Sequence, residues 1–153
     1  MYRIAAVVLF VMSFAAGCGT DPPPPSDEVL ISRFEQYRPE FERLLSITKD
    51  RARVITSYSA GDPEVQSQMR LLGINTIDGP GSTVRFRCTG GSYLHSVDKG
   101  YIFIPPESSQ PSPTYVLDSL DGSVDVPSER GAYDVYRVIG DGWFLYRVVN
   151  SDE

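Results

Sequence analysis

The residue pair best suited to nucleophilic chemistry in this 153-residue chain is Cys88 and His95. An imidazole that accepts the thiol proton would turn the sulfur into a nucleophile. Cys88, however, shares one face of an expected strand with Val84 and Phe86, which favours a buried, unreactive thiol. One histidine and one cysteine also fall short of a four-ligand zinc site. We therefore predict no catalytic residues, no metal and no cofactor.

A second candidate for chemistry is the aspartate series Asp118, Asp121 and Asp125, with Gly122 between them. Carboxylates around a glycine turn are faintly similar to a calcium loop. The spacing departs from the alternating ligands of an EF-hand, and no bidentate glutamate closes the series. The pattern therefore favours a solvated turn over a calcium site.

Aromatic residues are the third candidate group, with nine tyrosines and one tryptophan in the chain. Aromatic residues in strands mostly fill the core, but exposed tyrosine and tryptophan concentrate where proteins bind each other. The partner-binding candidates are Tyr93, Tyr101, Trp143 and Tyr146.

These candidates are positioned by an expected helical layer followed by strands. Apolar residues at steps of three and four predict a helix over 27–49, kinked near Pro39. Asp62-Pro63 starts a short second helix that ends at Gly73. Strands are expected at 83–88, 93–97, 101–104 and 115–117, with 98–100 as a turn, and a C-terminal hairpin over 133–149.

The expected fold is therefore α+β. The two helices pack on an antiparallel sheet of about four to six strands that ends in the C-terminal hairpin. Both faces of the hairpin carry apolar residues, which places it centrally in the sheet. Residues 51–60 fit no single pattern, and 118–131 read as turns.

The first residues have the pattern of a secretory targeting signal. Arg3 precedes an apolar run over 4–12, and the small residues Ala15, Ala16 and Gly17 come directly before Cys18. Ala15-Ala16-Gly17-Cys18 resembles the lipobox of bacterial lipoproteins. That resemblance implies removal of a signal peptide, residues 1–17, and attachment of acyl chains such as palmitate to Cys18. Each buried methylene contributes about 0.8 kcal/mol, so two or three chains hold a domain on a membrane.

A short tether is expected over residues 18–26, because four consecutive prolines favour an extended polyproline II conformation. A single domain then spans 27–153. In lipoproteins of bacteria with two membranes, aspartate after the cysteine often signals retention in the inner membrane. The residue here is Gly19, so in a cell with two membranes the resemblance implies the outer membrane, on its periplasmic side.

The net charge of the chain bears on which classes of partner it can bind. The chain has 20 acidic and 14 basic residues, a net charge of −6. An acidic chain has no electrostatic footprint for nucleic acid, but it suits a basic protein. The oligomeric state does not follow from the sequence.

The order of elements resembles that of small, uncharacterised periplasmic lipoproteins. We expect a non-enzymatic, membrane-anchored envelope lipoprotein that binds another protein. Two alternatives stay open, namely an immunity or inhibitor-type lipoprotein against a periplasmic toxin or hydrolase, and a lipoprotein that binds a small ligand or lipid. A thiol-dependent enzyme using Cys88 is the least favoured class.

Overall fold

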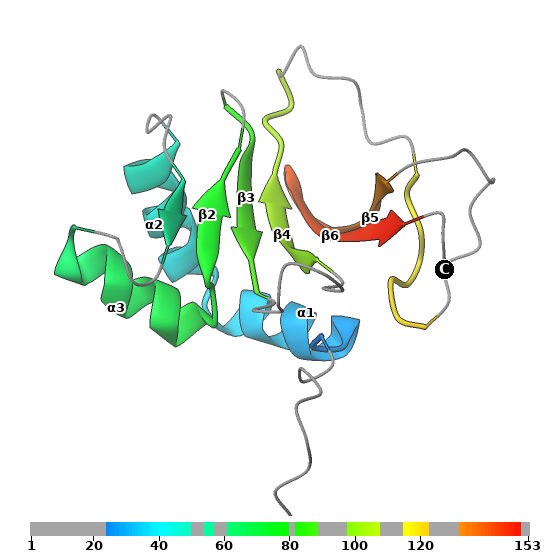
Figure 1. The fold of residues 1–153 in the computed structure, drawn as a ribbon, viewed down its shortest axis with the longest axis horizontal. Coiled ribbons are helices and arrows are strands. Elements are labelled where there is room, and N and C mark those ends of the chain that lie inside the picture. The colour runs from blue at the N-terminus through cyan, green and yellow to red at the C-terminus, as the bar shows by residue number, and fades with distance from the viewer. Residues whose placement is uncertain are drawn as a thin grey trace, which may run out of the picture.

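The computed structural model describes residues 24–49, 54–56, 61–79, 82–88, 98–107, 115–122 and 132–150. Within them, three helices pack on one antiparallel sheet (Figure 1), which confirms the expected α+β class. The helices are α1 (Asp27–Gln36), α2 (Arg38–Thr48) and α3 (Pro63–Leu72). The strands are β1 (Ile55–Thr56), β2 (Thr76–Asp78), β3 (Val84–Arg87), β4 (Lys99–Phe103), β5 (Ala132–Gly140) and β6 (Trp143–Asn150).

The interruption expected near Pro39 is present and is sharper than a kink. Helix α1 ends at Gln36, and α2 begins at Arg38 with Pro39 in its first turn. Proline is tolerated there because the first backbone N–H groups of a helix have no partner inside the helix. Tyr37 separates the two helices with φ −119° and ψ 26°. The buried stripe nevertheless continues across the break, from Phe34 to Phe41.

Local signals define α3 at both ends, as expected. The Asp62 carboxylate accepts the Glu64 N–H at 3.0 Å, and Pro63 opens the helix. Gly73 closes it with φ +66°, a conformation that favours glycine. None of the described helices is long and apolar enough to cross a membrane.

The strand order in the sheet is β1-β2-β3-β4-β6-β5. The hairpin β5–β6 is confirmed, and Gly142 has φ +74° in its turn. The hairpin was expected at the centre of the sheet, and this is correct only for β6. Strand β5 lies at the edge of the sheet. The segment expected as a strand at 115–117 forms a single parallel bridge between Val116 and Tyr136, which covers this edge of β5. The expected strand at 93–97 lies outside the described residues.

Two sequence expectations about strands need correction. Residues 98–100 were expected to form a turn, but Lys99 and Gly100 begin β4 and pair with β6. Lys99 tolerates this buried position because carboxylates surround its ammonium group. Strand β2 was not expected, because three residues are too few to show a period of two.

Alternation along the strands gives the sheet an inner face toward the helices and an outer face away from them. Register places Phe86, Tyr101 and Leu145 side by side on the inner face. Phe41 of α2 packs on this face, with its ring 4.6 Å from that of Tyr101 and 6.2 Å from that of Phe86. In Figure 1, α1 crosses below the sheet, while α2 and α3 lie toward its β1–β2 side.

Candidate functional site

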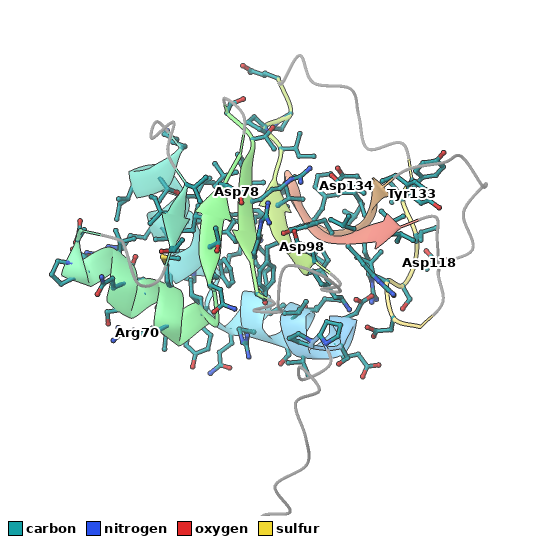
Figure 2. All side chains as sticks on the ribbon, viewed as in Figure 1. Arg70, Asp78, Asp98, Asp118, Tyr133 and Asp134 are labelled. Carbon is teal, nitrogen blue, oxygen red and sulfur yellow. The ribbon has the colours of Figure 1, made fainter. Side chains whose placement is uncertain are left out.

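Polar and charged side chains gather on the outer face, and strand register explains why. Asp78 lies opposite Arg85, while Arg87 lies opposite Gly100. Gly100 in turn lies opposite Tyr146. These residues follow a period of two, the same period that buries Val84 and Phe86 on the inner face. Asp78, Asp98 and Asp134 are labelled in Figure 2, where they follow the strands from β2 toward β5.

Arg87 is shared by two carboxylates. Its Nε lies 2.8 Å from Oδ2 of Asp78, and its Nη1 lies 3.1 Å from Oδ2 of Asp98. The Tyr146 hydroxyl donates a long hydrogen bond of 3.4 Å to the other Asp98 oxygen. Only glycine fits opposite Arg87, because a Cβ at Gly100 would collide with the backbone of β3.

A second group of contacts continues toward β5. Arg85 pairs with Asp134, whose Oδ2 also accepts the Tyr136 hydroxyl at 3.1 Å. The Arg85 guanidinium lies over the Tyr146 ring, 5.4 Å from its centroid, which is a cation–π contact. This contact joins the two groups. We call the joined set the outer-face network, and its members are Asp78, Arg85, Arg87, Asp98, Asp134, Tyr136 and Tyr146.

Perturbed pKa values coincide with this network, as they do at many functional sites. Burial raises the pKa of the Asp98 carboxyl, and although Arg87 opposes this effect, the charge of Asp78 adds to it. Burial also raises the pKa of Tyr136 to about 12, with a further contribution from Asp134. For Arg87, burial acts to lower the pKa, but Asp98 and Asp78 together raise it. Asp98 is therefore a partly buried carboxylate whose desolvation is not fully offset by the charge of Arg87.

Apolar side chains adjoin the network on β5 and β6. Val138 is 57% exposed and lies opposite Phe144, and Val116 is 50% exposed and lies beside Tyr136. The Tyr136 and Phe144 rings pack edge to face at 6.2 Å. We call Val116, Tyr136, Val138 and Phe144 the apolar patch. An exposed apolar and aromatic patch beside charged groups is the usual composition of a protein-binding surface.

A different ionic cluster lies where α1 begins, around the buried side chains of Asp27 and Lys99. Lys99 Nζ lies 2.6 Å from Oδ1 of Asp27 and 2.6 Å from Oδ1 of Asp121. Arg137 Nη1 lies 2.9 Å from the other Asp27 oxygen, which also accepts the Leu120 N–H at 2.7 Å. We call Asp27, Lys99, Asp121 and Arg137 the helix-start cluster.

The helix-start cluster holds the first residue of α1 on the sheet. Asp121 accepts the Asp27 N–H at 2.9 Å and so replaces a helical partner that this group lacks. Burial acts to raise the pKa of Asp27, but the Leu120 N–H, Lys99 and Arg137 outweigh it and lower the pKa. Asp27 and Lys99 side chains are 1% and 2% exposed. These contacts explain the cluster as a structural junction.

Three of the four aromatic residues expected to bind a partner have structural roles instead. Tyr101 is fully buried, and its hydroxyl donates to the Leu30 carbonyl at 2.9 Å. Trp143 is 2% exposed and packs against Phe34. Tyr146 has no exposed surface and lies under Arg85. The structure thus removes these three as direct partner contacts, whereas Tyr93 lies outside the described residues.

Among the described residues, the other sequence candidates form no reactive site. Cys88 is partly buried against the core, and burial raises the pKa of its thiol to about 12, so the sulfur is protonated at neutral pH. Its possible partner His95 lies outside the described residues. Asp118 is exposed and Asp121 binds Lys99, while Asp125 is also outside the described range. Among the described residues, no group of three or more His, Cys, Asp or Glu side chains could hold a metal.

Most residues of the outer-face network were not identified from the sequence. The alternation that places Val84 and Phe86 inward also places Arg85 and Arg87 outward, so this part of the network had a signal in the sequence. Asp98 had no such signal in the sequence. It directly precedes β4, and it meets Arg87 only because the strands pair.

Comparison with protein-family models, with curated proteins and with solved structures finds no match for this chain. The function proposed below therefore rests on the residues of the chain itself.

Proposed function

We propose that the chain is a membrane-anchored envelope lipoprotein whose domain binds another protein through the outer face of its sheet, without catalysis. The lipobox-like sequence that ends at Cys18 supports the anchor, and the proline-rich tether supports a stand-off from the membrane. The observation that carries the binding role is the apolar patch, because Val138 is 57% exposed beside the packed Tyr136 and Phe144 rings.

Surface binding is favoured over a ligand pocket between helices and sheet. In the described part of the core, that space is filled by aromatic side chains. Phe34 lies 5.2 Å from Trp143 and 5.3 Å from Phe41, measured between ring centroids. Phe41 lies 5.9 Å from Trp143. Rings at these separations are in direct contact, so the packing supports a structural core beneath an interacting surface.

The test is affinity capture of the full-length protein from crosslinked envelopes, followed by mass spectrometry. Three forms are compared, namely the wild type, Val138→Glu and Leu71→Glu. Leu71 is a matched control, since it is 52% exposed but lies on α3. We expect one stoichiometric partner with the wild type and with Leu71→Glu, and its loss with Val138→Glu. Equal recovery with both variants, or no partner with the wild type, would overturn the proposal.

A further inference from the structure

The outer-face network has an imbalance of charge that bears on the chemistry of the partner. Three carboxylates, on Asp78, Asp98 and Asp134, face two guanidinium groups. Arg85 is taken by Asp134. Arg87 is divided between Asp78 and Asp98, so this end of the network retains negative charge.

Asp98 is the carboxylate with the weakest contacts at this end. Its Oδ2 has Arg87 at 3.1 Å, but its only partner at Oδ1 among the described residues is the Tyr146 hydroxyl at 3.4 Å, beyond the usual length of an O–H···O bond. Its side chain is 20% exposed, which leaves part of the carboxylate open to another molecule. The raised pKa of Asp98 agrees with incomplete compensation.

We infer that Asp98 receives a lysine or arginine side chain of the protein partner, while the apolar patch receives an aliphatic or aromatic side chain of the same partner. This inference rests on the function proposed for the outer face, and it adds which charge the partner carries and which residue recognises it. Asp98 lies opposite Val148 and next to Tyr146, so a single partner covering β5 and β6 reaches both places.

A cation at Asp98 would favour the ionised carboxylate. Binding therefore requires the charged form and weakens as the pH falls through the pKa of Asp98. Among the described residues, the charged and titratable groups that face Asp98 are Arg87 and Asp78 from β3 and β2, and Tyr146 from β6, with Arg85 above that ring. The pKa values of Tyr146 and Arg87 are raised further above the acid range, so we assign the acid dependence to Asp98.

The experiment uses the full chain in intact envelopes, with Val138 replaced by a photo-reactive benzoylphenylalanine. The yield of the crosslinked adduct is compared with and without Asp98→Asn, Asp98→Glu and Asp141→Asn. Asp141 is the matched control, because the same charge is lost from a side chain that is 100% exposed at the hairpin turn. Thermal unfolding of each variant verifies that the fold is retained.

We expect Asp98→Asn to lower the adduct yield about thirtyfold, which is the low end of the range for removing one partner of a buried charge pair. Asp98→Glu should restore most of the yield, and Asp141→Asn should leave it unchanged. The yield of the protein with native Asp98 should fall in acid, and that of Asp98→Asn should not. An adduct of undiminished yield with Asp98→Asn would overturn this inference alone, whereas no adduct with native Asp98 would overturn the proposed function.

Discussion

The ammonium group of Lys99 lies 2.6 Å from the Asp27 carboxylate, and both side chains are almost entirely buried. This pair joins the first residue of α1 to the first residue of β4. It lies directly after the predicted tether, which ends at residue 26. A pulling force on the tether would therefore act first on the helix-start cluster.

Removing Asp27 from this cluster takes one carboxylate partner from Lys99 and one from Arg137. We expect Asp27→Ala to lower the free energy of unfolding by about 3 kcal/mol, because the carboxylate it removes is 1% exposed and binds Lys99, Arg137 and the Leu120 N–H. Glu28→Ala is the control, since Glu28 is exposed in the same helical turn. Urea denaturation of both variants measures the difference. Equal, small losses would show that the cluster is not a structural junction.

The same cluster predicts a pH dependence of stability. The pKa of Asp27 is lower in the folded protein than its ordinary value of 3.8. Such a group stabilises the fold above its unfolded pKa, and this contribution is lost as the pH falls through the folded pKa. We expect the free energy of unfolding to fall on acidification below pH 3.8. Asp27→Asn should flatten that decline, and an unchanged slope would contradict the assignment.

Cys88 should react slowly with thiol reagents in the folded protein. The thiolate is the reactive form, and burial raises the pKa of this thiol to about 12. The measurement is the rate of maleimide labelling in a Cys18→Ser background, with and without denaturant. Ser32→Cys, placed on the exposed side of α1 in a background lacking Cys88, supplies a reactive control. Comparable rates at both positions would restore Cys88 as a candidate nucleophile.

Cys18 is predicted to carry the membrane anchor. We expect Cys18→Ala to retain its signal peptide and to lose acylation, because the lipobox cysteine is both the site of lipid attachment and the residue after the cleavage point. Intact mass spectrometry and metabolic labelling with a fatty acid measure the two effects. A Cys18→Ala protein that is still cleaved and acylated would require a different anchor.

Local elements could be predicted from the sequence because their signals are local. Helix α3 has its N-cap, first-turn proline and final glycine within twelve residues, from Asp62 to Gly73. The C-terminal hairpin likewise has two aromatic and β-branched runs around Asp141-Gly142. Each element therefore contains the chemistry that defines it.

Contacts between distant residues could not be predicted in this way. Lys99 looked like a turn residue, and its burial depends on Asp27 and Asp121, which come from other parts of the chain. Tyr101 and Trp143 looked like binding residues, because aromatic type alone does not tell which face of a strand meets the helices. The exposed Val138 carried no comparable signal, and only the sheet register places it beside Phe144.

The most direct test of the account is hydroxyl-radical footprinting of the domain, free and bound to its captured partner. Oxidation reports the solvent exposure of individual side chains. We predict that oxidation of Val116, Tyr136 and Val138 falls in the complex, while oxidation of Leu71 on α3 stays the same. Protection of Leu71 with unchanged oxidation of Val138 would contradict it and would place the partner on the helices.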